Sequence, residues 1–333
     1  MLDRIRPWIL LPSATLAIGI PASLLLFDVV QDAAERTAEH RFERQASDAQ
    51  HSIEARVNSY GDILYGMAAL FTSQPSVSRI QFRRYVESLD LKNRFPGFDV
   101  VNYAQLVRAA DRARFEEAVR KDISLNGRGY PEFRIKPSGE RPEYFVLVYV
   151  EPMGGFEFAF GLDMGVNPAV QDSRALAAAV RETRDSGRLT SSGLPIRIKG
   201  KNGREYVGLA MRLGVYRSEM PRETVEQRRE AFFGSVGAGF NVENLMKGVL
   251  DKRTSTYLHF KLYDVGSVAD GTASRNDQKK WLLFDSEQMS GPSSTRADDT
   301  ETDTRFTSVL PMEVGGRVWQ AHFRAPKAAY VDG

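Results

Sequence analysis

Apolar side chains recur every three or four residues along the N-terminal part of the chain. They are Phe42, Ala46, Ala49, Ile53, Val57, Tyr60, Leu64, Met67 and Phe71. This spacing is that of one face of an α-helix and approaches a coiled-coil seam. No proline lies between Val30 and Gln74, so we predict one long helix. Two partners are open for this stripe: we expect its lower part to pair with a second copy and its upper part to pack on its own domain.

An uncharged, mostly apolar run precedes that helix, from Pro7 to Phe27. A bilayer-spanning helix needs roughly 20 such residues, whereas the apolar core of a secretory signal has about 7–15. We therefore predict a membrane anchor; the alternatives are a cleaved signal peptide and a buried core helix. Arg4 and Arg6 precede the run, which favours a cytoplasmic N-terminus and places the rest of the chain outside the cytoplasm.

Beyond residue 76, β-rich runs alternate with short amphipathic helices, which predicts an α+β protein with antiparallel sheets. The segment FEFAFGLDMG alternates Phe156, Phe158, Phe160 and Leu162, as one face of a strand does. The segment EVGGRV predicts a two-glycine hairpin turn. The predicted segments are a cytoplasmic tail (1–6), a transmembrane helix (7–29), a stalk helix (30–75), a membrane-distal unit (76–230) and a smaller membrane-proximal unit (231–333).

Composition narrows the possible chemistry. The 333 residues are 42% hydrophobic and 26% charged, with a net charge of +2 and no long basic block, which argues for a packed globular body and against nucleic-acid binding. Cysteine is absent, so disulfides and thiolate metal sites are excluded. The four histidines are scattered without metal-ligand spacing, and no phosphate-binding loop occurs. We expect no metal and no cofactor.

One motif raises the question of catalysis. Residues 153–158 read MGGFEF, one letter from the GGDEF signature of diguanylate cyclases. In those enzymes the third position is an acid that serves the metal and the nucleotide. Phe156 can do neither, because metal-bound phosphates need hard oxygen ligands. We therefore expect no catalytic residues, and interpret Gly154 and Gly155 as a turn before a strand.

A wider resemblance covers the chain from about Ser76 to Leu250. Its motifs, in order, are FPGFDVVNYAQLV, DRARFEEAV, YVEP, FAFGLDM, AAVRETRDSGRLTSSGLPI, GLAMRLGVY and RREAFFGSVGAGF. In this order they resemble the CHASE family of extracytoplasmic sensor domains found in histidine kinases and nucleotide cyclases. The resemblance implies a stalk helix followed by two PAS-like subdomains, the distal one holding a ligand pocket. It also implies that this chain is the sensor portion of a longer receptor.

The resemblance also implies ligand-binding residues. Some family members bind flat heterocycles through an acid on a central strand and a threonine after a helix, which match Glu151 and Thr190 here. A buried carboxylate needs a donor partner, which a heterocyclic N–H can supply. Tyr149, Phe158 and Phe160 are the candidate aromatic lining. The alternatives are that Glu151 ends a strand at the surface and that Thr190 is an ordinary strand residue. Asp163 is interpreted as a structural helix cap.

Three functions follow from these patterns. The first is a sensor in the periplasm of a bacterial inner-membrane receptor, which binds a small molecule and passes its occupancy along a dimeric stalk to a cytoplasmic output domain absent from this chain. The second is an enzyme, either a diguanylate cyclase or another extracytoplasmic enzyme. The third is a structural adhesion ectodomain. A mostly apolar pocket with one buried acid favours the first, and no catalytic constellation supports the second.

Overall fold

The computed structural model describes residues 7–166, 173–192, 196–199, 205–268, 281–289 and 304–331. In helix α1 (Pro7–Thr72), side chains are described from Gly19 onward. The predicted tail, residues 1–6, lies outside the described residues, and so do the side chains of the first part of the predicted transmembrane helix. Among the described residues, no helix contains a stretch both long enough and apolar enough to cross a bilayer.

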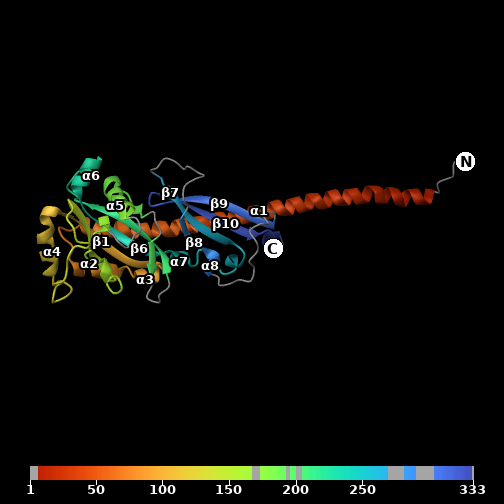
Figure 1. The fold of residues 1–333 in the computed structure, drawn as a ribbon. Helices are drawn as coiled ribbons and strands as arrows, with labels where there is room; N and C mark the ends of the chain where they lie inside the picture. The colour runs from red at the N-terminus through yellow and green to blue at the C-terminus, as the bar shows by residue number, and fades with distance from the viewer. Residues whose placement is uncertain are drawn as a thin grey trace.

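Helix α1 connects the two sheets, because it packs along both of them (Figure 1). Its C-terminal part runs along both sheets, and its N-terminal part extends beyond them. Every residue of the predicted apolar stripe, from Phe42 to Phe71, is buried against the chain itself. Phe42 stacks on Phe306, and Phe71 stacks on Tyr103. The long helix is thus confirmed, but the expected seam with a second copy at this stripe is wrong, because the chain's own sheets already cover it.

The first sheet has six antiparallel strands, in the order β2-β1-β6-β5-β3 with β4 paired to β5. The strands are β1 (Phe98–Arg108), β2 (Glu143–Glu151), β3 (Thr190–Ser191), β4 (Ile196–Lys199), β5 (Glu205–Tyr216) and β6 (Phe232–Asn241). Because β6 lies between β1 and β5, it belongs to the distal unit. The boundary predicted before residue 231 therefore needs correction, since the second sheet starts only at His259.

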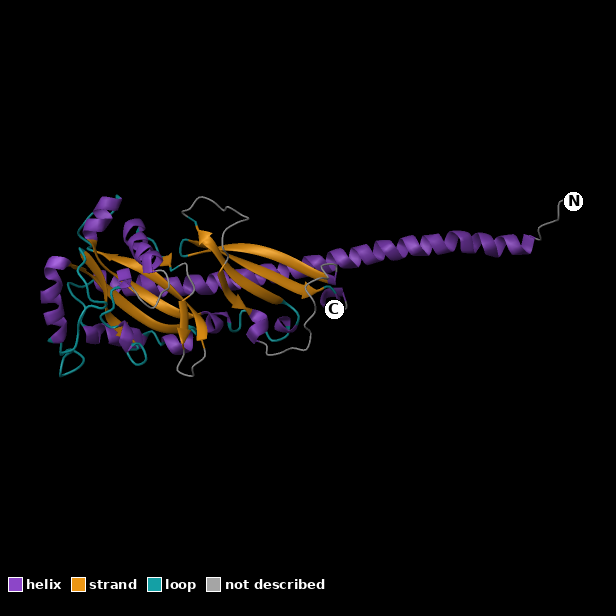
Figure 2. Cartoon of the chain, in the orientation of Figure 1, coloured by secondary structure: helices purple, strands orange, loops and turns teal. Residues whose placement is uncertain are grey.

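Helices cover both faces of this first sheet (Figure 2). One face packs on α1 through Val101, Tyr103 and Met211; the other packs on α5 (Ser173–Ser186) through Phe145 and Val180. The remaining helices of this unit are short. They are α2 (Arg79–Ser88), α3 (Leu91–Arg94), α4 (Arg112–Arg120), α6 (Val225–Ala231) and α7 (Val242–Met246).

The second sheet has four antiparallel strands in the order β8-β7-β10-β9. Its elements are β7 (His259–Ser267), β8 (Trp281–Asp285), α8 (Ser286–Met289), β9 (Arg305–Val314), β10 (Arg317–Pro326) and α9 (Ala328–Val331). The predicted hairpin joins β9 to β10 through Gly315 and Gly316, which have φ angles of 53° and 73°. Both values lie in the left-handed region that glycine adopts without a steric penalty, so this prediction is confirmed.

The segment from Phe156 to Leu162 is not the predicted strand. Gly154 and Gly155 form the expected turn, but Glu157–Ala159 is a short 3₁₀-helix. Gly161 then has a φ of 83°, and a Cβ there would lie 2.5 Å from the carbonyl oxygen of Arg134. An extended strand cannot pass through that backbone conformation, so the alternating phenylalanines do not form one face of a strand. Phe158 is 61% exposed, whereas Phe160 packs on Phe133.

Candidate functional site

The predicted aromatic residues Tyr149 and Phe160 do lie together, but they surround a side chain of the protein itself. The guanidinium carbon of Arg79 lies 4.9 Å from the ring centre of Tyr149, 4.8 Å from that of Phe160 and 4.6 Å from that of Tyr130. Arg79 is almost fully buried, and its Nε donates to the Asp122 carboxylate over 3.2 Å. The flat group between these rings is therefore a guanidinium of the chain, held by cation–π contacts and an ion pair.

Glu151 ends β2, opposite Val101 of β1, and is half-buried. Burial raises the pKa of its carboxyl, while the charge of Arg83 opposes that rise. The described residues give its carboxylate no hydrogen-bond partner. Its role as a ligand acceptor stays a prediction.

Thr190 lies on β3, at the opposite edge of the first sheet from Glu151, with β1, β6 and β5 between them. Its hydroxyl is buried, bonds to the hydroxyl of Thr183 on α5 and donates to the carbonyl of Arg212. The structure therefore does not bring Glu151 and Thr190 into one pocket. Thr183 lies on α5 and Arg212 lies on β5, so the Thr190 hydroxyl connects this helix to this strand.

Asp163 is buried at the start of the 3₁₀-helix Met164–Val166. Its carboxylate accepts from the backbone N–H groups of Gly165 and Phe145, each over 3.0 Å, and from Nε of Arg141 over 2.9 Å. The cap that the sequence predicts is present, and it is also one half of a buried ion pair.

The Glu151→Gln variant tests whether the folded protein disfavours the ionised form of the Glu151 carboxyl. Because the folded pKa is raised, the ionised form is disfavoured in the folded state, and the stability that the neutral form provides is lost as pH rises through that pKa. We expect Glu151→Gln to be more stable than the parent at about pH 7, and the difference to vanish below about pH 4, where the carboxyl is protonated in both states. Urea unfolding of both proteins across this range measures it. If the variant is less stable than the parent at neutral pH, the pKa of Glu151 is not raised in the folded protein.

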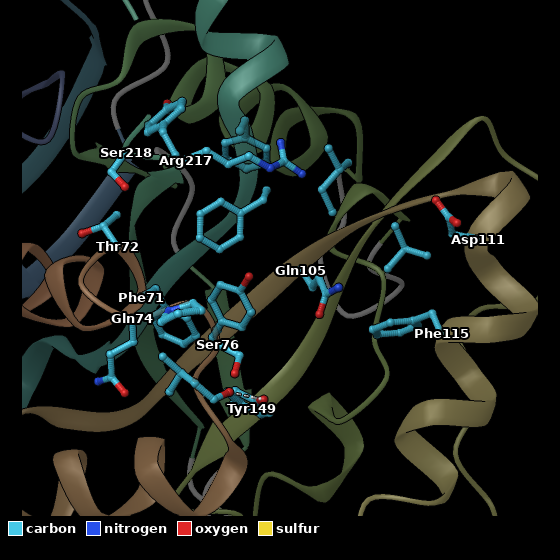
Figure 3. Close-up of a pocket in the computed structure, with 18 of the residues that line it drawn as sticks. Phe71, Thr72, Gln74, Ser76, Gln105, Asp111, Phe115, Tyr149, Arg217 and Ser218 are labelled. Carbon is cyan, nitrogen blue, oxygen red and sulfur yellow. Dashed lines mark hydrogen bonds between the residues drawn. The ribbon is translucent and has the colours of Figure 1, made fainter. Parts of the chain in front are cut away.

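A recess with a volume of about 1080 Å³ lies at the far end of the first sheet (Figure 3). Helix α1 ends at Thr72 because Pro75 cannot continue it, whereas β1 extends to Arg108. Phe71 in the last turn of α1 still covers Tyr103, with ring centres 4.0 Å apart. Gln105 lies two residues further along the same strand face, and α1 no longer covers it.

The walls of this recess come from four directions, as Figure 3 shows. Gln74 and Thr72 of the α1 end lie on one side, and Phe115 of α4 on the other. Tyr149 of β2 and Arg217, which follows β5, complete it. Of the predicted ligand residues, only Tyr149 lines this recess.

The recess is lined by aromatic rings and by polar groups that have unused hydrogen-bond donors or acceptors. The amide of Gln105 has no hydrogen-bond partner among the described residues. Arg217 donates to the carbonyl of Glu230 over 3.1 Å, and its guanidinium lies 5.9 Å from the ring centre of Phe233. Its remaining N–H groups are available to a ligand. Sequence reasoning missed both residues, although a polar Gln105 between Tyr103 and Val107 on one strand face was a usable signal.

A metal centre is not formed by the described part of the chain, where no group of three or more His, Asp or Glu side chains is placed to hold an ion. The polar groups of the recess are an amide, hydroxyls and separate charges. Such groups suit binding of an organic molecule.

Residues 75–275 match the family described as CHASE domain, which is more than half of the chain. A comparison with curated proteins gave no match. Solved structures with a similar fold include an extracellular ligand-binding receptor from Desulfohalobium retbaense, with 10% identity and a TM-score of 0.46 over 86% of this chain and 40% of that one. This chain thus spans less than half the length of that receptor.

Two further solved structures are similar over almost their whole length. One is the ligand-binding domain of an amino-acid chemoreceptor of Pseudomonas aeruginosa in complex with GABA, with 13% identity, a TM-score of 0.42, and coverage of 87% of this chain and 99% of that one. The other is the periplasmic sensory domain of a Campylobacter jejuni chemoreceptor, with 11% identity, a TM-score of 0.43, and coverage of 91% and 98%.

Proposed function

This chain belongs to the CHASE domain family, and on that premise we propose that it senses a small molecule bound in the recess beyond the end of α1. The observation that carries this proposal is the position of the recess. Its wall includes Phe71 and Thr72, the last residues of the helix that packs on both sheets and extends beyond them. A ligand there would contact α1 directly, and differential contact with two positions of the helix is what a sensor requires.

The lining indicates what kind of molecule fits. Phe115 and Tyr149 offer flat apolar surface, while Gln105 offers a donor and an acceptor and Arg217 offers further donors. A small molecule with a flat apolar part and polar substituents satisfies both. The alternative of catalysis is less well supported, because Phe156 occupies the place of the acid in a cyclase motif.

We also propose the cellular setting. The part of α1 that extends beyond the sheets carries large exposed apolar side chains, which are Ile20, Leu24, Leu25, Leu26, Phe27, Val29 and Val30. An exposed apolar surface of this extent marks a site of contact with a membrane or with another protein. A bacterial inner membrane, with the two sheets in the periplasm, provides such a contact. A second copy joined through this same part of α1 would form the dimer, in place of the stripe now buried within the chain.

Filling the recess tests the site. Gln105→Trp places a large ring on the recess floor, so we expect it to weaken binding of any ligand identified by thermal-shift screening by more than about 10-fold, which is 1.4 kcal/mol. Gln320→Trp is the matched control, since Gln320 is also a half-buried strand glutamine but lies on β10 of the other sheet. Isothermal titration with each variant measures the change. Equal affinity of the parent and Gln105→Trp would place the ligand elsewhere.

A further inference from the structure

A β-bulge shapes the first sheet beside the recess. Val215 of β5 pairs with Gly234 of β6, but the next residue, Tyr216, pairs with Phe232. Phe233 is thus an extra residue of β6, and such a bulge turns a side chain out of the regular alternation. Phe232 packs in the core on the far side of the sheet, whereas Phe233 packs against the core that contains α1. The bulge therefore places a ring on the α1 face, where it lines the recess.

Gly234 keeps the floor of the recess open. It pairs across the sheet with Gln105 of β1, and a Cβ at Gly234 would lie 2.5 Å from the hydroxyl of Tyr103. Tyr103 and Gln105 are two residues apart on β1, so both side chains lie on the α1 face. Neither side chain has a hydrogen-bond partner in the part of the chain that the structure describes. A hydroxyl and an amide are thus available to a ligand.

Arg217 brings a positive charge to the same recess, and Figure 3 shows its side chain there with that of Gln105. Its backbone N–H donates to the carbonyl of Ala231 over 2.8 Å, which continues the pairing of β5 with β6 past the bulge. Burial raises the pKa of Tyr103, and the charge of Arg217 opposes this rise, so the guanidinium acts on the Tyr103 hydroxyl. No carboxylate of the described residues forms an ion pair with Arg217.

The other charged groups of the lining balance one another. Asp111 and Arg114 form an ion pair over 2.7 Å. Arg108 and Glu219 are both exposed and carry opposite charges. Arg217 is therefore the one positive charge of this lining that is left in excess. A ligand that carries a single negative charge would neutralise it.

We infer, on the basis of the proposed function, that the ligand of the recess is an aromatic carboxylate anchored by Arg217. A guanidinium presents a planar fork of donors that matches the two oxygens of a carboxylate. Gln105 and Tyr103 can each donate to the same group. An aromatic ring can pack on the rings of Phe115 and Phe233, which also line the recess. A phosphate ester with two negative charges would match the single excess cation less well.

The test uses the full chain and two probes, benzoate and benzamide, which share one ring and differ in charge. Isothermal titration should show that the parent binds benzoate at least about 10-fold more tightly than benzamide, because a hydrogen bond to a charged group is stronger than a neutral one. Arg217→Met removes the charge and should abolish this preference. Arg222→Met, at an exposed arginine that does not line the recess, should keep it. The melting temperature of each variant shows that it is folded.

Gln105→Trp separates the ligand class from the site. We expect it to weaken benzoate binding, because it fills the recess. If benzoate binds parent and Gln105→Trp equally well, the carboxylate binds outside the recess. Equal affinity of the parent for the two probes, or a preference that persists in Arg217→Met, also overturns the inference. If a ligand found by screening is lost in Gln105→Trp but binds Arg217→Met as tightly as the parent, the proposed function stands and the carboxylate assignment is wrong.

Discussion

Replacing Asp163 with alanine is expected to lower the free energy of unfolding by about 3–5 kcal/mol, as the loss of one partner from a buried ion pair does. The carboxylate is 1% exposed and accepts three hydrogen bonds. Its removal leaves the Arg141 guanidinium and the backbone N–H groups of Phe145 and Gly165 without these acceptors. Each unsatisfied buried group adds its own desolvation cost.

Chemical denaturation of the parent and of Asp163→Ala measures this effect. Glu87→Ala is the control, because the Arg83–Glu87 pair joins side chains that are 45% and 60% exposed. Exposed pairs of this kind contribute roughly 0–1 kcal/mol. A loss for Asp163→Ala no larger than that of Glu87→Ala would show that Asp163 is not the buried anchor described above.

Replacing Phe42 with alanine is expected to cost about 3–5 kcal/mol, the usual range for a buried phenylalanine. Phe42 is 1% exposed and contacts the rings of Phe306 and Tyr330, with centres 5.6 and 5.9 Å away. It therefore joins α1 to β9 and α9 within one chain. Because the packing is intramolecular, the loss should not depend on protein concentration.

Tyr65→Ala is the matched control, since Tyr65 lies on the same helix but is 52% exposed. It should change the unfolding free energy much less than Phe42→Ala. If the two variants lose similar amounts, the stripe is not a core. If the loss in Phe42→Ala grows on dilution, the stripe instead forms a seam between copies, as its heptad-like spacing first suggests.

Local patterns gave reliable predictions where local physics decides the structure. The 3–4 spacing from Phe42 to Phe71 defines a helix whatever covers it, and Gly315-Gly316 defines a turn whatever the strands pair with. The same spacing cannot tell which surface covers the stripe. A covering sheet on the same chain and a second helix demand the same apolar residues.

Long-range strand pairing explains the features that local patterns did not predict. No local feature of the β6 sequence shows that this strand pairs between β1 and β5. The predicted boundary between the two units was therefore placed before β6. Glu151 and Thr190 match a family pattern, but strand order puts them on opposite edges of the sheet. The alternation at Phe156–Leu162 imitates a strand until the backbone at Gly161 is considered.

The central claim is that a ligand in the recess contacts the end of α1. Hydrogen exchange of the full chain, followed by mass spectrometry with and without a ligand found by thermal-shift screening, tests it most directly. The account predicts slower exchange in peptides that cover Phe71 to Val77 and the β1 segment around Gln105. Slower exchange confined to the second sheet, with the end of α1 unchanged, would contradict it.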